Sequence, residues 1–480
     1  MRRYPLIGVR VNYGGQPLTI SGYRCIHSLL TRSGTPSCDA VQRREAAPVT
    51  PQNQQPIRQV VLASFIGTTI EWYDFFIYGT AAALIFNQLF FPTFSDVAGT
   101  LAAFAVFGAG FVVRPLGGIV FGHFGDRLGR KSMLVLSLFI MGAATFLIGL
   151  LPTYDSLGVL APVLLVVLRL LQGFAVGGEW GGAVLMAVEH SPENRRGYHG
   201  SWPQSGAPAG LVLASAAFAL VSLLPKDDFM SWGWRVPFLC SVALLLVGLL
   251  IRLRLAETPD FEKVKQSGGQ ARLPVVEAIR RHPKNLLLAF GACIAPFLQF
   301  YLFGTYILTY ATTELKMERG TVLLIVSIAA ALEVITIPAF AALSDRIGRR
   351  KVFLGGTIAF ILYAYPFFLL IDTGSPLVLA LATILGLSVI HPAMYGPLAA
   401  LFADMFSARV RYSGASLGYQ IGGMLGGGFA PVILTSLQAA AGSAIVGIPP
   451  YMIAAGLITI VATYLATRAA TTREAHAVEV

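Results

Sequence analysis

Long apolar segments recur along this chain and constrain its fold more than any other feature of the sequence. A helix that crosses a lipid bilayer needs about 20 mostly apolar residues. Twelve segments of the 480-residue chain fit, near residues 60–90, 98–121, 132–151, 158–187, 199–223, 235–251, 285–311, 320–343, 352–371, 376–402, 413–437 and 448–467. Only 12% of the residues are charged, against about 25% in soluble proteins. The sequence therefore predicts an all-α membrane protein with twelve transmembrane helices.

Basic residues cluster in every second connection between these segments. The even-numbered connections carry Arg127, Arg130, Lys131, Arg195, Arg196, Arg346, Arg349, Arg350, Lys351, Arg409, Arg411 and eight basic residues within 252–284. The odd-numbered connections hold far fewer, chiefly Lys226, Lys316 and Arg319. Because arginine and lysine favour the cytoplasmic side, we expect these even connections and both termini to be cytoplasmic. The net charge of +11 is then a topology signal, and we expect no nucleic-acid partner.

A basic motif occurs twice. GDRLGRK at residues 125–131 is echoed by SDRIGRR at residues 344–350, 219 positions later. A duplicated loop after the second segment of each six predicts two six-helix halves related by a parallel repeat. We expect an N-terminal half at residues 59–251 and a C-terminal half at residues 285–468. A cytoplasmic linker at residues 252–284 joins them, and a cytoplasmic tail follows at residues 469–480.

Residues 1–58 differ from the rest of the chain. They hold eight arginines against only Asp39 and Glu45, and no continuous apolar core. We interpret them as a disordered cytoplasmic extension; an Arg-rich transit peptide is the alternative. Met1 is the only methionine before Met133, so a further hypothesis is that translation starts downstream at another codon.

Two carboxylates lie within the first apolar segment. Glu71 and Asp74 are three residues apart, and on a helix they share one face with Tyr78. Low dielectric disfavours an ionised carboxylate, so such a group can take up and release a proton near neutral pH. Proton coupling by at least one of them is the favoured interpretation. A permanent ion pair that holds the first helix to its neighbours is the alternative.

Depth in the membrane separates the two carboxylates. With a rise of about 1.5 Å per residue, Glu71 lies roughly 16 Å and Asp74 roughly 21 Å from the cytoplasmic end of the first helix. Arg114 and Glu179 both lie near 12 Å on the same measure. Asp74 is then nearest the midplane, where carriers bind substrate. We expect Asp74 to be the protonated site, with Glu71 and then Glu179 as the other candidates.

Opposite charges occupy equivalent places in the two halves. Arg114 lies twelve residues before Asp126, and Glu333 lies twelve residues before Asp345. We expect Arg114 and Glu333 to face a cavity between the halves; a charge pair sealed within each half is the alternative. Arg114 would either bind a substrate carboxylate through its planar fork or neutralise Glu71 or Glu179.

A polar stripe marks the fourth segment. Arg169, Gln172, Val176 and Glu179 recur at steps of three and four, and such a stripe normally faces a bundle interior or a watery cavity. The C-terminal half adds tyrosines and His391, although tyrosines often only pack and a lone histidine is usually a satisfied interior group. The expected substrate-binding residues are Tyr78, Arg114, Arg169, Gln172, Gln299, Tyr306, Glu333, His391 and Tyr395.

The duplicated basic loops are candidate gates. A carboxylate just before a helix is favoured by the helix N-terminus, and the basic residues can pair with acids on neighbouring helix ends. The candidate gating residues are Gly125, Asp126, Arg127, Gly129, Arg130, Asp345 and Arg346. A topology signal alone is the alternative.

Signals for an enzyme, a metal or a cofactor are weak. The G-x-S-x-G pattern at residues 414–418 opens an apolar helix instead of a strand-to-helix elbow, and no Walker A sequence is present. The four cysteines show no metal-ligand spacing. Gly414, Gly418, Gly422 and Gly426 predict a face for close helix packing. We expect no enzyme activity, no metal and no cofactor, with energy supplied by an ion gradient.

Several longer motifs together resemble a known family. They are EWYDF, RPLGGIVFGHFGDRLGRK, RLLQGFAVGGEWGG, EHSPENRRG, SWPQSGAPAG, SWGWRVPF and RYSGASLGYQIGGMLGGGFAP. They are similar to the metabolite:proton symporters of the major facilitator superfamily, relatives of the shikimate, 2-oxoglutarate and proline/betaine carriers. The similarity runs from about residue 59 to 468. The second loop departs from the pattern, with Ala341, Ala342 and Leu343 where a glycine is typical.

The resemblance implies a rocker-switch carrier with proton-driven uptake across a bacterial inner membrane, whose loop motif belongs to the outward-facing state. The leading hypothesis is a proton-coupled symporter that imports a small carboxylate-bearing metabolite by alternating access and works as a monomer in the lipid bilayer. A zwitterionic osmolyte carrier is the second hypothesis, although the long charged C-terminal extension of the osmosensing relatives is missing. A membrane receptor that kept the fold and lost transport is the third.

Overall fold

The computed structural model describes residues 9–13, 16–20, 57–128, 130–177, 180, 184, 187–188, 191–254, 279–280, 283–406 and 411–478. Side chains are described within these ranges except at residues 9–13, 16–20, 60, 122–123, 125–128, 130–131, 134, 193, 252, 254, 411–413 and 469–478. All statements below concern this part of the chain.

The chain divides into two units, Met1–Gln55 and Pro56–Val480. In the first unit, β1 (Val9–Tyr13) and β2 (Gln16–Ile20) pair as antiparallel strands. This hairpin is not expected from the sequence, and the rest of the expected extension up to residue 56 lies outside the described residues.

The second unit is helical. The helices of its N-terminal part are α3 (Ile57–Leu84), α4 (Phe86–Phe90), α5 (Asp96–Val112), α6 (Arg114–Leu128), α7 (Arg130–Leu150), α8 (Tyr154–Leu157), α9 (Leu160–Val176), η1 (Glu193–Arg195), α11 (Arg196–Val221), α12 (Lys226–Asp228), η2 (Phe229–Gly233) and α13 (Arg235–Arg254). Those of its C-terminal part are α16 (Pro283–Tyr301), η3 (Leu302–Tyr306), α17 (Ile307–Thr313), α18 (Arg319–Ile347), α19 (Arg349–Ile371), α20 (Pro376–Thr383), η4 (Ile384–Ile390), α21 (His391–Met405), α22 (Arg411–Gly423), η5 (Met424–Gly428), α23 (Ala430–Ala441) and α24 (Ala444–Val478).

The predicted membrane segments are confirmed as helices. In the described ranges, nine helices are long and apolar enough to cross a membrane. The bent pair Lys226–Gly233 and Arg235–Ile251 fits the sixth predicted segment, and the shorter apolar helices Val135–Leu150 and Leu160–Val176 fit the third and fourth. The first segment is shorter than predicted, because the backbone leaves helical geometry at Ile85 (φ −147°) before α4 begins.

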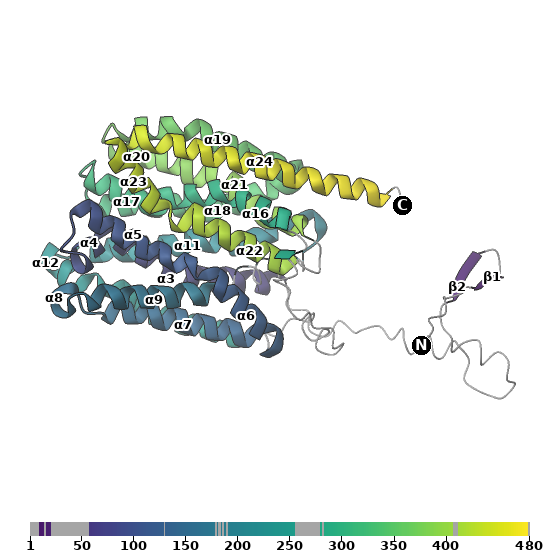
Figure 1. Ribbon diagram of the computed structural model, residues 1–480, viewed down its shortest axis with the longest axis horizontal. Helices are drawn as coiled ribbons and strands as arrows, with labels where there is room; N and C mark the ends of the chain where they lie inside the picture. Colours follow the sequence, from purple (N-terminus) through teal and green to yellow (C-terminus); the bar gives the residue numbers. More distant parts are fainter. Residues whose placement is uncertain are drawn as a thin grey trace. The chain divides into compact units, whose positions relative to one another are not determined.

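The helices run roughly parallel to one another between two ends of a bundle (Figure 1), with α4, α8, α12 and α17 at one end. The two halves meet along two seams. In the first seam α11 packs along α18, and in the second α5 and α6 pack against α22, η5 and α23. This arrangement places the acidic first helix α3, which packs on α11, near the middle of the bundle.

Close backbone packing fixes the relative position of two helices that carry central arginines. A Cβ atom at Gly173 of α9 would lie 1.8 Å from the Gly110 carbonyl oxygen, and one at Gly177 would lie 1.9 Å from that of Arg114. Only glycine fits at such separations. Because Arg114 and Arg169 project from these two helices, their backbones are held at a fixed spacing.

The glycine row of α22 and η5 also packs as the sequence predicts. Gly418, Gly422 and Gly426 each face α16, where a Cβ atom would meet Ala289, Cys293 or Ile294 at 2.3–2.8 Å. Both helices belong to the C-terminal half, so the row stabilises that half internally.

We expect Gly173→Ala to prevent stable assembly of the N-terminal half. The added methyl group would overlap the Gly110 carbonyl, so α5 and α9 must move apart, and such overpacking costs about 1–3 kcal/mol or more. The matched control is Gly355→Ala in α19, where no atom lies within 4 Å of the new methyl. The control should stabilise the protein by up to about 1 kcal/mol. Thermal unfolding in detergent checks both variants, and an unchanged Tm for Gly173→Ala would contradict the packing.

Candidate functional site

Two buried arginines enclose one aromatic ring in the N-terminal half. The guanidinium carbon of Arg169 lies 3.7 Å from the ring centroid of Phe75, and that of Arg114 lies 4.2 Å from it. Arg114 and Arg169 are 2% and 0% exposed. Further rings surround the pair: Phe111 and Trp72 contact Arg114, whereas Tyr78 and Phe107 contact Arg169. Desolvated cation–π contacts of this kind stabilise a cation by roughly 2 kcal/mol each. These five rings, which we call the aromatic cage, therefore stabilise both charged guanidinium groups in the absence of water.

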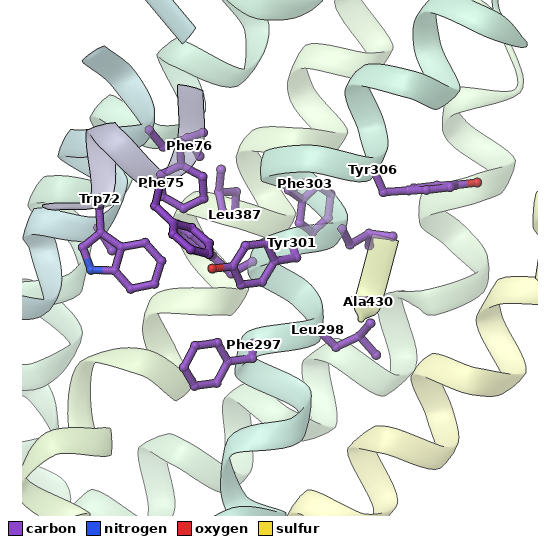
Figure 2. Close-up of a cluster of buried hydrophobic side chains, with 14 of the residues drawn as sticks. Trp72, Phe75, Phe76, Phe297, Leu298, Tyr301, Phe303, Tyr306, Leu387 and Ala430 are labelled. Carbon is purple, nitrogen blue, oxygen red and sulfur yellow. The ribbon is translucent and has the colours of Figure 1, made fainter. Parts of the chain in front are cut away.

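The cage leaves several donors unused. Arg169 Nε and Nη2, and Arg114 Nε, make no hydrogen bond with any described residue. Tyr301 of α16 adds a buried hydroxyl from the other half that is also unpartnered among these residues. Figure 2 shows that this hydroxyl points toward Trp72 and Phe75 of α3. Donors from both halves therefore converge where a buried anion would satisfy them.

Gln172 links Arg169 to the first and third membrane segments. Arg169 Nη1 donates to Gln172 Oε1 over 2.8 Å, and Gln172 Nε2 donates to Thr145 Oγ1 over 2.6 Å and to the Asp74 carbonyl over 3.5 Å. The predicted stripe thus brings Arg169 and Gln172 together, while Glu179 lies outside the described residues.

Asp74 is the most isolated carboxylate of the described chain. It is 1% exposed, and neither carboxylate oxygen has a hydrogen-bond partner among the described residues. The Thr145 hydroxyl lies close to this carboxylate and donates to the Met141 carbonyl over 2.9 Å. Glu71 is also buried, and it lies near enough to Arg114 to interact with its charge. Since an unpaired buried carboxylate is strongly destabilised when ionised, Asp74 is suited to carry a proton.

A second acidic group lies in the C-terminal half. Glu333 of α18 is hydrogen-bonded to His391 Nδ1, and both side chains are buried. The imidazole stacks on Tyr395 with ring centroids 5.0 Å apart, and the tilted ring of Phe300 lies 5.3 Å from it. His391 Nε2 and Glu333 Oε2 have no other partner in the described structure. The pair therefore forms within its own half, as in the alternative of a sealed pair, and does not join Arg114.

A small central cavity lies between the N-terminal half, which carries Arg114 and Arg169, and the C-terminal half, which carries Glu333 and His391. It has a volume of about 10 Å³, and its walls include Trp72 and Ala207 from one half and Phe300, His391 and Tyr395 from the other. Such a volume holds no more than about one water molecule. Neither Arg114 nor Glu333 lines it, so the structure shows the halves closed around the site, and a metabolite requires them to separate.

Polar and aromatic contacts also join the halves directly. Trp180 of the N-terminal half stacks on Tyr419 of the C-terminal half with centroids 3.6 Å apart, and a hydrogen bond of 2.7 Å within the C-terminal half holds the Tyr419 hydroxyl to that of Tyr395. Two amides cross the seam in addition, Gln204 Nε2 to the Tyr395 carbonyl over 2.7 Å and Gln420 Nε2 to the Gly177 carbonyl over 3.1 Å.

Asp345 links the predicted loop motif to the opposite half. Its carboxylate accepts hydrogen bonds from the backbone N–H groups of Gly197 and Tyr198, at 3.0 Å and 2.9 Å, at the beginning of α11. Arg349 lies 3.7 Å from Asp345 and also pairs with Asp404. Arg346 is exposed at the end of α18. The side chains of Asp126, Arg127 and Arg130 and the residue Gly129 lie outside the described set, while the backbone of Gly125 belongs to α6.

Two predicted substrate residues, Tyr306 and Gln299, have partners away from the arginine pair, while a third, Tyr78, lies against Arg169. Tyr306 donates to Gln438 Oε1 over 2.5 Å, and Figure 2 shows its ring directed away from the Trp72–Tyr301 cluster. Gln299 Nε2 donates to the Gly386 carbonyl over 2.9 Å inside the C-terminal half. Tyr78 is fully buried beneath Arg169 and contacts Phe86 and Phe107.

Two central residues, Phe75 and Trp180, were not among the expected site residues, whereas Tyr301 and Tyr419 belong to the tyrosines that the C-terminal half adds. Phe75 lies four residues after Glu71 and three before Tyr78, so helical spacing could have placed it on the same face. The stacking of Trp180 on Tyr419 joins residues of different halves, and no local pattern indicates such a contact.

A bundle of two packed helical halves with buried charges at its centre is the architecture expected of a secondary transporter. The sequence model described as Major Facilitator Superfamily matches residues 64–431 and 288–479, so the chain belongs to that superfamily. It is a multi-pass membrane protein and a transporter, not an enzyme.

Curated proteins that this chain resembles over most of its length are transport proteins. A shikimate transporter of Escherichia coli strain K12 is 44% identical over 383 residues, which cover 79% of this chain and 87% of the relative. The inner membrane metabolite transport protein YhjE of that strain is 40% identical over 428 residues, or 88% and 96% of the two chains. Its proline/betaine transporter is 34% identical over 403 residues, or 81% and 80%.

The fold also matches solved structures. The structure of the proton:xylose symporter XylE bound to a bromodeoxyglucose has a TM-score of 0.65 at 16% identity, covering 86% of this chain and 95% of that one. A partially occluded inward-open structure of XylE from E. coli gives the same TM-score at 17% identity, over 86% and 97% of the two chains. This likeness shows the shared fold.

Proposed function

We propose that this transporter is a proton-coupled symporter that imports a small carboxylate-bearing metabolite. One observation carries the proposal: two buried guanidinium groups flank Phe75, and three of their nitrogen donors have no hydrogen-bond partner among the described residues. A carboxylate offers two acceptor oxygens in the geometry of the guanidinium fork. An anion bound here would satisfy these donors and offset the repulsion between two nearby cations.

Asp74 supports the coupling part of the proposal. It lies beside the Arg169–Gln172 pair, through its backbone carbonyl, and its carboxylate has no partner in the described structure. A neutral Asp74 leaves the two arginines as the dominant charges of the site and favours loading of the anion. Loss of the proton restores a negative charge that competes with the substrate. Glu71 and Glu179 stay the alternative proton sites.

The closed centre is the reason for proposing alternating access, because a substrate can reach it only when the two halves separate. In the proposed cycle, residues 59–251 and 285–468 rock as two halves, joined by a cytoplasmic linker at residues 252–284. Both termini and the Asp345 link would then be cytoplasmic, and the protein would work as a monomer in an inner membrane. The positive-inside pattern supports this orientation.

The shikimate and metabolite transport relatives support a small organic acid as cargo, because they are the more similar of the relatives described above. The proline/betaine relative keeps a zwitterion as the second candidate. We propose testing uptake in proteoliposomes with labelled shikimate, other organic acids and glycine betaine, with and without an imposed inward proton gradient.

The expected result is accumulation of one carboxylate only with the gradient, and no accumulation in empty vesicles or after adding a protonophore. Gradient-driven accumulation of betaine alone would establish the osmolyte carrier instead. Binding without counterflow of any compound would indicate a receptor.

We expect Asp345→Asn to open the cytoplasmic side more readily. The carboxylate caps the N-terminus of α11 across the seam, and an anion at this position contributes about 1–2 kcal/mol, a factor of roughly 5–30 in population. The control Asp404→Asn removes a carboxylate that is 51% exposed and pairs with Arg349. Spin-label distances between α11 and α18 check the shift, and equal distributions in both variants would argue against a gate at Asp345.

A further inference from the structure

A larger cavity lies at the other end of the α11–α18 seam from Asp345. Its volume is about 320 Å³, and both halves form its wall, including Ser222, Lys226 and Phe229 from one and Thr312, Glu318 and Arg319 from the other. α11 begins beside Asp345 and has 26 residues, so its two ends are about 39 Å apart. Small-molecule sites typically have volumes of roughly 300–1,000 Å³. This outer cavity has room for a metabolite, unlike the central one.

Two cations without acidic partners line the outer cavity. Lys226 and Arg319 make no ion pair with any described residue, and Glu318 is the single carboxylate in the wall. Asp227 and Asp228 are exposed on α12 and do not line the cavity. Ser222 Oγ is buried in the wall without a partner in the described structure. The cavity thus presents an excess of positive charge and an unused hydroxyl.

Arg319 also joins the halves at this end. Its guanidinium carbon lies 4.7 Å from the ring centroid of Phe229, which belongs to η2 of the N-terminal half. A second contact between the halves runs from Thr309 Oγ1 of α17 to the Ala83 carbonyl of α3, over 3.1 Å. An anion that binds the Arg319 fork would therefore compete with a ring that keeps this end closed.

We propose that the outer cavity is a separate binding site for a small carboxylate, held between Lys226 and Arg319 before the centre opens. The identity of the ligand as a carboxylate rests on the proposed function. Bound there, the carboxylate draws Arg319 away from Phe229, so occupancy weakens one contact between the halves on the outer face.

Thiol chemistry tests the site without transport. Thr312→Cys is placed in a full-length chain whose four native cysteines are replaced by serine or alanine. The rate at which the introduced thiol is modified is measured in liposomes with an anionic and a cationic methanethiosulfonate, the sulfonatoethyl and trimethylammonioethyl reagents. We expect the anionic-to-cationic rate ratio to fall about tenfold at low salt when Lys226 and Arg319 both become glutamine.

Matched controls separate this effect from general surface charge. Lys316→Gln removes one charge from an exposed residue that lies close to Arg319 in sequence but does not line the cavity. Lys226→Gln removes the same charge from the wall and is compared with it directly. The single exchange at Lys226 should lower the ratio, whereas Lys316→Gln should change it by less than about twofold. Equal effects of the two would overturn the proposal.

Benzoate is the ligand probe. It should slow modification of the introduced thiol in the Thr312→Cys chain and lose this effect when Arg319→Gln is added. An absence of protection in the Thr312→Cys chain would show a merely solvent-filled crevice and overturn the proposal. The benzoate and uptake experiments distinguish failure of the outer-site proposal from failure of the proposed function. Protection by benzoate with no acid transported supports the outer site and overturns the proposed function, while gradient-driven uptake without protection does the reverse.

Discussion

Replacing Asp74 with asparagine is expected to abolish concentrative uptake while exchange of substrate continues. Asparagine has nearly the shape of a protonated aspartate but cannot release a proton, so the site would stay in its loading form. With one coupled proton, an imposed difference of one pH unit supports an accumulation ratio of about tenfold. In the variant this ratio should fall to one, and counterflow should keep a rate near that of the wild type.

The measurement combines gradient-driven uptake and counterflow of the same labelled acid in one vesicle preparation. Asp155→Asn is the control, because Asp155 is exposed on α8 and far from the centre in sequence and structure. Full accumulation by the Asp74 variant would show that this carboxylate is structural. Glu71→Gln would then be the next variant to examine.

Replacing Arg169 with glutamine is expected to raise the half-saturation concentration for a carboxylate substrate by about 30-fold or more. Removing one partner of a buried, hydrogen-bonded charge pair costs roughly 2–5 kcal/mol. Arg169→Lys should recover little, since an ammonium keeps the charge but lacks the planar fork that stacks on Phe75 and reaches Gln172.

Initial-rate kinetics over a range of substrate concentrations check this expectation. Arg235→Gln is the control, because Arg235 is also an arginine over a ring, Trp234, although only partly buried. It donates to the carbonyls of Gly149 and Leu151 at the end of α7. The control should lower stability and leave substrate affinity unchanged. Equal affinity loss in both variants would mean that Arg169 acts only through folding.

The fold and the main charges of the site follow from local sequence. Apolar length defines the helices, and helical spacing places Arg169 beside Gln172, because both signals lie within single helices. The contacts between halves do not follow. Tyr301 and Tyr306 are five residues apart with the π-helix η3 ending at Tyr306, and only Tyr301 faces the centre. An extra residue in a helical turn re-aims the following side chains, and no residue type in that stretch announces it.

Neither the partner of Glu333 nor that of Arg114 is decided by the sequence, which leaves a cavity-facing and a paired arrangement open for each. Both depend on which partner lies across a helix–helix contact, a choice that involves residues 58 positions apart in the case of Glu333 and His391. The internal repeat gave equivalent positions for Arg114 and Glu333 but no information on their neighbours, since the two halves differ in the side chains around them.

The glycine contacts between α5, α6 and α9 have a consequence for how the transporter releases its substrate. Backbones that touch at Gly110–Gly173 and Arg114–Gly177 cannot slide past each other without losing their fit. Arg114 and Arg169 should therefore move as one rigid body in the proposed cycle, with a constant distance between their backbones. In the proposed cycle, release of the substrate would then require the C-terminal half to move. Withdrawal of Tyr301 and of the helix that begins at His391 would admit water that competes for both guanidinium groups.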